Sequence, residues 1–485
     1  MSKQSQGDLK RFKEVIASRG KETGPWRGQV RGGELFDGRH GNHPPGIAQP
    51  GRYPELSGAM LSSSRACRVV AGAGIGGAGL LAYQIGKYKV GTRRRFELED
   101  PPAPGSPEFA RIVAAATGAP LRRGNRVLIM RNGTTLTAML DAVSSAKSTI
   151  NLSSYIYWPG DIADRFSEAL IERAQAGVEV NLVLDGYGSA KLDGRRLDHL
   201  DRSGVHVSIF RPPSWCQVRK LNNRMHRRIL VVDGRVAFVG GVGIADVWTG
   251  NAEDPEHWRE THLRVEGPAV TELLGGFVEN WTEATGRLLN ATHVPEVAPF
   301  EDGMALQVTR STPIGGPTAL TQLFYAAIAG ARRRLWMTTA YFAPDRAFED
   351  VLCEAARRGV DVRILVNGRR VDKEVARQAG HRSYSRLLEA GARIFEYDKT
   401  MLHAKVLLVD DCWGNVGSGN FDSRSFDLDL EINVAIHDRR LVEELDSHFQ
   451  EDLTVSREIH LEQWKQRPLR KRAAELATEL TRQSL

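Results

Sequence analysis

The alternation of apolar and polar residues from about residue 101 onward predicts regular elements of two kinds. Short runs rich in β-branched and aromatic residues alternate with stretches whose apolar residues recur at helical spacing. One such unit consists of the apolar run 148–157, the helical pattern IADRFSEALIERAQAG and the apolar run 178–185. A strand, a helix and a second strand in this order predict a sheet that contains parallel strands and carries helices on its faces.

The same order of elements occurs a second time. The apolar run 333–342 precedes the helical pattern FEDVLCEAARRG and the apolar run 360–366. Both copies share the pattern Glu-x4-Gly-Val-acid-Val, which begins at Glu172 in the first copy and at Glu354 in the second. The repeat predicts an α/β fold of two similar lobes, each a mixed sheet flanked by helices, packed face to face. We place the lobes at residues 101–300 and 301–460, with the linker near residues 294–301.

The two ends of the chain have a different composition. Residues 1–60 are rich in Gly, Arg, Pro and Gln and have no apolar periodicity, so they are expected to be disordered. Near the other end, Leu469, Ala473, Leu476 and Leu480 form an apolar stripe with basic flanks. Residues 461–485 are therefore predicted to form a basic amphipathic helix. Packing on the body of the protein is its first interpretation, and contact with a membrane surface is the alternative.

An uncharged run, 69–86, lies between these regions and is just long enough to span a membrane. Residues 61–100 are thus predicted to be a membrane anchor with a basic linker, and a buried glycine-rich helix is the alternative. More basic residues follow the run than precede it, which places its C-terminal side in the cytoplasm. Met60 begins a short basic leader directly before the run, so it is a second candidate for the start of translation.

Composition narrows the class of partner without selecting one. The formal net charge of +7 favours anionic partners, and both nucleic acid and anionic lipid headgroups qualify. The 4 cysteines are scattered and contain no CxxC pair. This spacing argues against a disulfide framework or a zinc site and is typical of a reducing compartment.

The most specific feature of the sequence is a pair of matching histidine segments. The first, HRRILVVDGRVAFVGGVG, begins at His226, and the second, HAKVLLVDDCWGNVGSGN, begins at His403. A histidine, a cation, an aspartate and a glycine recur at the same spacing in both segments. A single copy would carry little information, whereas two copies of His-x-cation-x4-Asp before a glycine-rich turn are highly specific. The members are His226, Arg228, Asp233 and Gly240 in the first segment, and His403, Lys405, Asp410 and Gly417 in the second.

The spacing within each segment indicates how these groups are presented. Side chains two residues apart in a strand share a face, so each histidine points the same way as the cation that follows it. Asp233-Gly234 is a hairpin signal. The glycines after the hairpin, among them Gly240 and Gly241, allow backbone N–H groups to approach an anion closely. Two such halves can place their histidines on opposite sides of one phosphate, in a single shared active site.

This constellation suits phosphodiester exchange without a metal, and we expect no cofactor. One neutral imidazole attacks phosphorus, and the other, protonated, donates to the leaving alcohol. Arg228 and Lys405 then stabilise charge on the equatorial oxygens. No set of Asp, Glu and His has the sequence spacing of a metal site. The alternative for one histidine, a hydrogen-bonded core residue, is disfavoured for two that occur in register with cations.

The paired segments resemble the HKD motifs of the phospholipase D superfamily, and their surroundings resemble the bacterial cardiolipin synthases. The likeness covers roughly residues 100–480 and is carried by LNNRMHRRILVVDG, WRETHLRVEGPAV, AYFAPD, YSRLLEAGARIFEY, MLHAKVLLVD and GSGNFDSRSFDLDLEINV. It implies a phosphatidyltransferase that joins two phosphatidylglycerol molecules into cardiolipin through a phosphohistidine intermediate. The implied partners are anionic phospholipid and the bacterial inner membrane. The apolar run and the basic charge also favour lipid over nucleic acid, and the charge bias around the run places the catalytic lobes in the cytoplasm.

The resemblance also implies roles for further residues. Glu260 and Glu431 occupy the positions of carboxylates that orient the histidines, although the interval from His226 to Glu260 is longer than that from His403 to Glu431. An ordinary strand-surface acid is therefore the alternative for Glu260. Asp233 and Asp410 complete the motifs and are candidates for a part in the chemistry. The alternative is that each stabilises a turn or forms a salt bridge. The candidates for substrate binding are Asn420, Ser418, Gly240, Gly241 and Tyr341, and core packing is the alternative for Tyr341.

The first motif departs from the family pattern at two positions. Arg228 stands where the family has Lys, and Gly243 stands where it has Asn. Arginine keeps the charge but has a larger planar head group, and Gly243 removes a side-chain amide donor. An active, adjusted site is our interpretation. Two alternatives stay open: a phospholipase D or phosphodiesterase that uses water as acceptor, and a lipid-binding membrane protein whose site has decayed. The sequence does not indicate the oligomeric state.

Overall fold

The computed structural model describes residues 29–31, 34–36, 96–212, 222–313 and 317–467. The predicted membrane run, 69–86, and most of the predicted amphipathic helix lie outside the described residues, so both stay predictions. Among the residues that the structure describes, no helix has the length and apolar character needed to cross a membrane. Within residues 1–60, strands β1 (Gln29–Arg31) and β2 (Glu34–Phe36) pair antiparallel, an exception to the disorder expected there.

Fifteen strands form one continuous sheet that runs through both lobes, in the order β19-β14-β13-β11-β15-β16-β18-β10-β3-β9-β8-β7-β4-β5-β6. The first lobe contributes β3 (Arg122–Arg131), β4 (Thr149–Ser154), β5 (Glu179–Asp185), β6 (His206–Phe210), β7 (Ile229–Val232), β8 (Val236–Gly240) and β9 (Thr261–Glu266). The second contributes β10 (Met304–Ser311), β11 (Arg334–Thr338), β13 (Asp361–Asn367), β14 (Arg393–Tyr397), β15 (Val406–Val409), β16 (Trp413–Gly417), β18 (Glu431–His437) and β19 (Ser456–Ile459). A separate parallel pair consists of β12 (Phe342–Ala343) and β17 (Phe421–Asp422).

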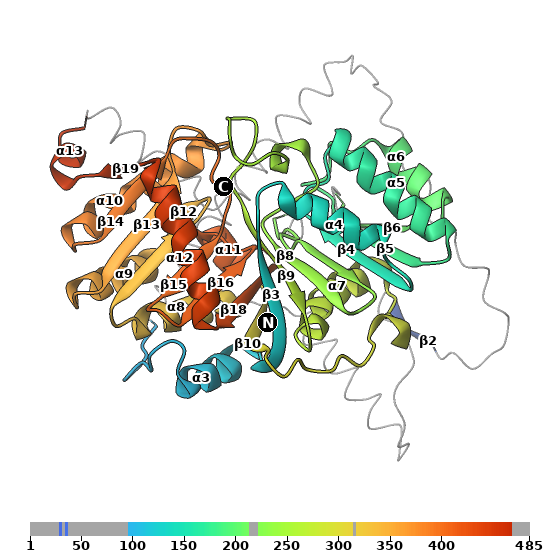
Figure 1. The fold of residues 1–485 in the computed structure, drawn as a ribbon, viewed down its shortest axis with the longest axis horizontal. Coiled ribbons are helices and arrows are strands. Elements are labelled where there is room, and N and C mark those ends of the chain that lie inside the picture. The colour runs from blue at the N-terminus through green and yellow to red at the C-terminus, as the bar shows by residue number, and fades with distance from the viewer. Residues whose placement is uncertain (1–28, 32–33, 37–95, 213–221, 314–316, 468–485) are drawn as a thin grey trace. The chain divides into compact units, whose positions relative to one another are not determined.

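The two lobes repeat one topology. In each, three strands are parallel, β4-β5-β6 in the first lobe and β11-β13-β14 in the second. The hairpins β7-β8 and β15-β16 then pair antiparallel beside β4 and β11. The lobes join where β3 pairs antiparallel with β10. Figure 1 shows them side by side, with β4, β5 and β6 in one and β13 and β14 in the other. The predicted strand–helix–strand repeat is confirmed.

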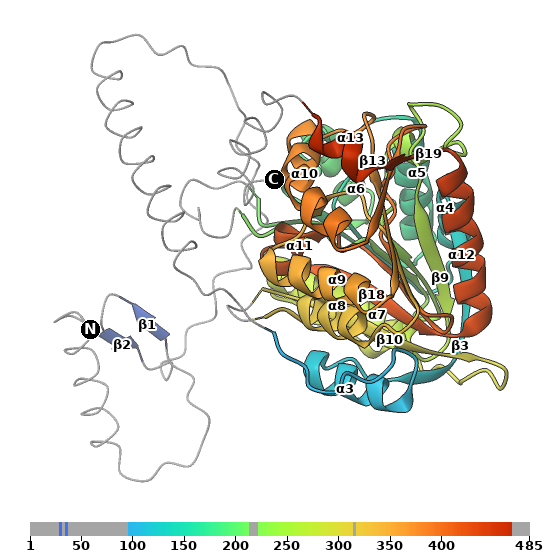
Figure 2. The same ribbon diagram turned by 90° about the vertical axis from the view of Figure 1, so that its left-hand side faces the viewer.

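Helices cover the sheet, and apolar side chains fill three cores. In the first lobe the helices are α4 (Thr134–Ser144), α5 (Asp161–Gln175), α6 (Gly194–Arg202) and α7 (Val270–Thr285). In the second they are α8 (Ala319–Gly330), α9 (Arg346–Arg357), α10 (Glu374–Glu389), α11 (Ser423–Asp427), α12 (Arg439–Thr454) and α13 (Leu461–Lys465). Figure 2 shows α8 and α9 on one side of the second lobe's strands and α12 on the other. One core lies in each lobe, and a central core includes residues of both lobes.

Helix α3 (Pro107–Thr117) precedes the first lobe in the sequence but lies with the second lobe in space. It begins at Ser106, whose side chain accepts a hydrogen bond from the Phe109 N–H, and ends at Gly118 in the left-handed conformation. The Gln307 amide of β10 donates to the carbonyl oxygen of Ala110, at 3.0 Å. Phe109 also stacks edge-on against Trp413, which belongs to the core of the second lobe. Residues 294–301, the predicted linker, lie in the connection between the 3-10 helix Ala291–His293 and β10.

Candidate active site

Both motif histidines lie just before a strand, in a segment that hydrogen-bonds to the opposite lobe. The His226 N–H donates to the Leu430 carbonyl at 3.0 Å, and the Leu430 N–H donates to the Arg224 carbonyl at 2.8 Å. In the same way, the His403 N–H donates to the Arg259 carbonyl at 2.8 Å. Each lobe thus fixes the backbone position of the other lobe's histidine, which brings both motifs to one site between the lobes.

The carboxylates of this site pair with the histidines across the lobe interface. Nδ1 of His226 lies 2.9 Å and 3.1 Å from the two carboxylate oxygens of Glu431, and Nδ1 of His403 lies 2.5 Å from Glu260. Each histidine thus pairs with the glutamate of the opposite lobe, which the intervals along the chain did not indicate. Both glutamates are fully buried, which also excludes the interpretation of Glu260 as a strand-surface acid.

Burial sets the protonation of this cluster. It lowers the pKa of His226 to about 4, reinforced by Arg228, and it lowers the pKa of His403 well below the usual value, reinforced by Lys405 and Arg228. Both imidazoles are therefore neutral at pH 7. Burial also raises the pKa of Glu260 to about 7 and lowers the pKa of Lys405 to about 7.

The two cations contact the histidines differently. Arg228 donates from Nη1 to the His226 carbonyl at 2.7 Å, and its Nη2 lies 3.1 Å from His226 Nε2. A guanidinium has no acceptor, so His226 Nε2 must accept and Nδ1–H must donate to Glu431. Lys405 instead donates to the His403 carbonyl, and its Nζ lies 3.0 Å from His403 Nδ1. The structure thus fixes the tautomer of His226 but places no cation on Nε2 of His403 among the described residues.

Aromatic side chains that the sequence did not single out line both histidines. Trp248 and Trp258 lie with their ring centroids 5.4 Å from that of His403, and Tyr155 lies 5.1 Å from that of His226. The guanidinium of Arg228 is 5.4 Å from the Tyr155 ring centroid. Trp258 lies two residues before Glu260 in the WRETH segment. This position could have identified Trp258 as a residue of the site from the sequence.

Gly243, the second departure from the family motif, is explained by Trp248. A Cβ atom at position 243 would lie 2.9 Å from Trp248 Cζ3 and 3.1 Å from Ile156 Cβ. Trp248 is fully buried, so it has no room to move aside. The indole therefore occupies the space that a side chain at position 243 would need, and the glycine is required by the tryptophan that contacts His403.

We expect Gly243→Asn, the change that restores the family residue, to lower rather than raise activity. The asparagine side chain would force Trp248 off His403, and overpacking of a buried site costs about 1–3 kcal/mol. Thermal unfolding and phosphatidyl transfer should both be measured. Gly194→Asn, at the start of α6 with open space around its Cβ position and no positive φ, is the control that carries the same side chain outside the site. An active and fully stable Gly243→Asn variant would contradict this explanation.

The proposed substrate-binding residues of the glycine-rich turns surround the two glutamates. Ser418 donates from Oγ to Glu431, and a Cβ at Gly241 would collide with the carboxylate of Glu260. A Cβ at Gly240 would lie 2.5 Å from Nδ1 of His262. Gly241 thus leaves room for the Glu260 carboxylate and Ser418 gives Glu431 a hydrogen bond, whereas Gly240 leaves room for His262. Asn420 is buried, and its side-chain oxygen has no hydrogen-bond partner within the described part of the chain, as expected of a group that awaits a ligand.

Asp233 and Asp410 hold the starts of strands rather than the reacting groups. Asp233 accepts hydrogen bonds from the N–H groups of Ser148 and Thr149 at 2.7 and 2.9 Å, and Asp410 accepts from that of Arg333 at 2.8 Å. Both have φ of +52°, as the turn of a tight hairpin requires. The histidines precede β7 and β15, whereas Asp233 and Asp410 follow these strands at their other ends. The structure therefore fits a role in the turn for both aspartates and does not fit a catalytic role.

Tyr341 lies at the edge of the site and is only half-buried. Its hydroxyl donates to Asp372 at 2.7 Å, and Nζ of Lys373 is 5.5 Å from its ring centroid. Burial and the negative charge of Asp372 raise the pKa of Tyr341. This position suits contact with a ligand better than the core packing that was its alternative.

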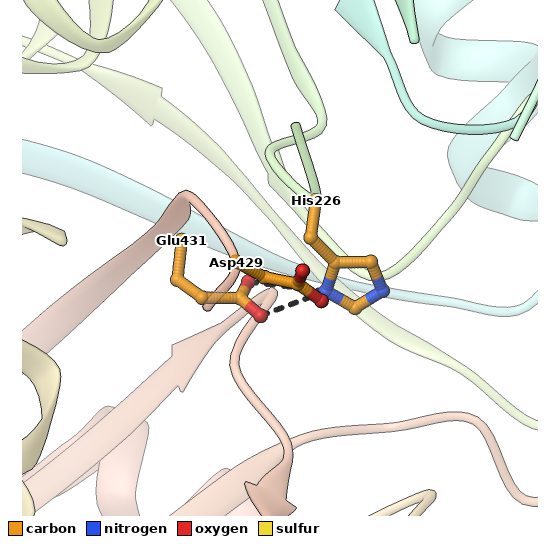
Figure 3. Close-up of side chains that lie close together, drawn as sticks. All are labelled: His226, Asp429 and Glu431. Atoms are coloured by element: carbon orange, nitrogen blue, oxygen red, sulfur yellow. Dashed lines mark hydrogen bonds and ion pairs between the residues drawn. The ribbon is translucent and has the colours of Figure 1, made fainter. Parts of the chain in front are cut away.

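The tertiary structure also brings together a His-Asp-Glu cluster, His226, Asp429 and Glu431, that the spacing of these residues in the sequence did not predict. The ligand atoms of His226, Asp429 and Glu431 lie within 4.8 Å of one another, and both carboxylates are on the Nδ1 side of the ring (Figure 3). However, Nδ1 donates to Glu431, and Asp429 accepts from Arg424 Nε at 3.1 Å. Burial raises the pKa of Asp429 to about 8, so this carboxyl is largely protonated at pH 7. The cluster therefore fits a hydrogen-bonded network better than a metal site.

Comparison with known families agrees with this geometry. The model of a family described as "Cardiolipin synthase, PLD-like domain" matches residues 139–274 and 324–453, one segment in each lobe. The chain belongs to this family. The resemblance inferred from the paired motifs is thus confirmed, together with the doubled α/β fold that it implied.

Curated relatives within the cardiolipin synthase family are similar over most of their length. Cardiolipin synthase 1 of Bacillus anthracis is 32% identical over 398 residues, which cover 79% of this chain and 77% of the relative. The cardiolipin synthase of Geobacillus kaustophilus is 33% identical over 384 residues, covering 78% and 76%. Among solved structures, phosphatidylserine synthase of Haemophilus influenzae aligns with a TM-score of 0.60 at 14% identity, covering 78% of this chain and all of that one. This last likeness supports the fold alone.

Proposed function

We propose that this protein transfers a phosphatidyl group from one phosphatidylglycerol to a second, forming cardiolipin and glycerol. The observation that carries the proposal is the pair of buried His–Glu dyads, each built from both lobes, with Arg228 and Lys405 beside them. Cardiolipin synthases 32–34% identical to this chain over most of their length support the choice of substrate. All groups needed for two-step phosphodiester exchange are present, which argues against a decayed site.

In the first step His226 acts as the nucleophile. Glu431 keeps the His226 proton on Nδ1, and the Nε2 lone pair attacks phosphorus once the bound phosphate takes over the hydrogen bond that Arg228 donates to Nε2. A P–N bond forms, the P–O bond to the glycerol headgroup breaks, and His403 gives a proton to the departing oxygen. Both histidines are neutral at pH 7 without substrate, so His403 takes up this proton from solvent when the negative charge of the bound phosphodiester raises the pKa of its imidazole.

In the second step the acceptor replaces glycerol at the same place. The terminal hydroxyl of a second phosphatidylglycerol gives its proton to His403, and its oxygen attacks the phosphorus of the phosphohistidine. The P–N bond breaks and His226 regains its lone pair, so the enzyme returns to its starting state. Arg228 and Lys405 stabilise the charge on the equatorial oxygens in both steps.

The test is lipid mass spectrometry after purified protein is incubated with phosphatidylglycerol vesicles. The proposal expects cardiolipin and free glycerol in equal amounts. Phosphatidic acid in place of cardiolipin would identify a hydrolase that uses water as acceptor. The absence of turnover, in a sample that binds the vesicles, would identify a lipid-binding protein without catalysis.

We expect EDTA to leave the transfer activity unchanged. Arg228 and Lys405 supply the positive charge that a metal ion would otherwise provide, and Asp429, the third member of the His-Asp-Glu cluster, is largely neutral at pH 7. Activity should be compared before and after dialysis against the chelator, with a zinc-dependent phosphodiesterase as the positive control for chelation. Loss of activity that zinc or magnesium restores would overturn the metal-free mechanism.

We propose that the protein acts at the cytoplasmic membrane with its lobes on the cytoplasmic side. The apolar run 69–86 and the basic residues that follow it support this location. The full-length chain is expected to resist extraction by carbonate and by high salt, whereas a truncated chain that begins near Phe96 is expected to be released. Extraction of the full-length protein by salt alone would reduce the attachment to electrostatic contact with the membrane surface.

A further inference from the structure

Cardiolipin formation requires a second anion site, because the acceptor lipid carries a phosphate of its own. The proposed reaction brings the acceptor hydroxyl to the phosphohistidine, and a three-carbon glycerol bridge joins that hydroxyl to the acceptor phosphate. Arg228 and Lys405 are already engaged with the transferring phosphate. A cation one glycerol length farther from His226 is therefore needed if the enzyme is to hold this charge in a buried site.

Arg224 stands at this position on the histidine segment. The hydrogen bonds of the Arg224 carbonyl and the His226 N–H to Leu430 show that the segment is extended. Alternate side chains of an extended segment share a side, so Arg224 and Arg228 flank His226 on the same side, with about 7 Å between successive Cα atoms of the three residues.

The guanidinium of Arg224 is buried and incompletely paired. The residue is 9% exposed, and its Nη1 has no hydrogen-bond partner among the described residues. The guanidinium lies 4.7 Å from the ring centroid of Tyr187, which is 62% exposed and connects this position to the surface. A buried arginine donor without a partner is costly unless a ligand completes it.

The acidic residues around Arg224 bond to other groups, so the charge of its guanidinium is available to a ligand. Asp429 accepts from the backbone N–H of Arg224 at 3.2 Å, and its other oxygen accepts from Arg424 at 3.1 Å. Asp185 accepts from three backbone N–H groups, of Tyr187, Gly188 and Met225. Burial raises the pKa values of both aspartates, that of Asp429 to about 8, so Asp429 compensates the charge of Arg224 and Arg424 less than an ordinary carboxylate would.

We propose that Arg224 binds the phosphodiester of the acceptor lipid. This inference rests on the proposed function, because it assigns the acceptor's place in the same site. The acceptor class is an anionic glycerophospholipid with a free terminal hydroxyl. Its phosphate pairs with Arg224 Nη1, which directs the hydroxyl oxygen at the phosphorus held on His226. Water and free glycerol lack this phosphate, so Arg224 favours the lipid acceptor over both.

Two reactions of the full-length protein separate acceptor binding from the rest of the mechanism. Cardiolipin formation from phosphatidylglycerol vesicles uses the acceptor phosphate. Exchange of labelled free glycerol into phosphatidylglycerol uses the same donor, the same phosphohistidine and the same hydroxyl position, but no acceptor phosphate. The ratio of the two rates therefore reports on the acceptor phosphate alone.

Arg224→Gln is expected to lower cardiolipin formation about 10-fold to 100-fold, as for the loss of a charged hydrogen bond, and to leave glycerol exchange nearly unchanged. Arg224→Lys, which keeps the charge, is expected to be intermediate. The matched control is Arg211→Gln. Arg211 pairs with Glu283 at 2.8 Å and donates to the Asn223 carbonyl of the same segment, so its loss disturbs the backbone without removing the proposed ligand. The control should keep the wild-type ratio.

The outcomes are distinct. A selective loss of cardiolipin formation in Arg224→Gln supports the acceptor site. Equal losses in both reactions, or unchanged cardiolipin formation, overturn it, because Arg224 would then serve the donor phosphate or the fold. A wild type that catalyses neither reaction would overturn the proposed function itself, and the acceptor site with it. Retained glycerol exchange shows at the same time that each variant is folded.

Discussion

Replacing either His226 or His403 with alanine is expected to lower cardiolipin formation by about 10⁴-fold or more, and replacing both should cost no more than either change alone. The reason is that the two imidazoles serve one phosphate in sequence, as nucleophile and as general acid. Once either is absent, the other has no reaction to assist. Two separate sites would instead give independent losses that multiply.

The measurement is the rate of transfer in wild type, in both single variants and in the double variant at equal concentrations of folded protein. His293→Ala is the matched control. His293 is fully buried and contacts Asn151 at 3.0 Å, but it belongs to neither motif. Its replacement is expected to lower stability without a comparable loss of rate per folded molecule. Multiplying losses for His226→Ala and His403→Ala would refute the single shared site.

Glu431→Gln and Glu260→Gln are each expected to reduce the rate by about 10³-fold or more, because an amide neither fixes the correct tautomer nor stabilises the imidazolium. The crossed pairing adds a specific expectation. Glu431→Gln should perturb His226, 205 residues away in the chain, and Glu260→Gln should perturb His403, 143 residues away. The ionised Glu431 holds the His226 proton on Nδ1, so its replacement frees the ring to change tautomer.

Nitrogen NMR of histidine-labelled protein provides the readout, since it reports the tautomer of each ring. Asp233→Asn is the control, because this carboxylate binds backbone N–H groups at the other end of β7. It should leave both histidine signals in place. A shift of His226 on replacement of Glu260, without a shift on replacement of Glu431, would show that the dyads form within each lobe and would contradict the structure.

The sequence by itself determined the repeated strand–helix–strand order, the two histidine motifs and the cations that accompany them. These features depend on short intervals along the chain, where backbone geometry relates spacing to direction. His226 and Arg228 are two residues apart, so an extended backbone must place them together. Asp233 and Asp410 follow the same logic, since a hairpin turn is a local property and its residues carry a local signal.

Only the tertiary structure decided which residues complete the site. Glu431 pairs with His226, and Trp248 occupies the space beside Gly243, because the lobes cross-link through backbone hydrogen bonds between segments that are distant in sequence. No interval along the chain encodes such contacts. Burial is decided in the same way: it makes both histidines neutral, keeps Asp429 protonated and leaves Arg224 with an unpaired donor. The charge of a group depends on the water that the whole fold removes from it, which local sequence does not specify.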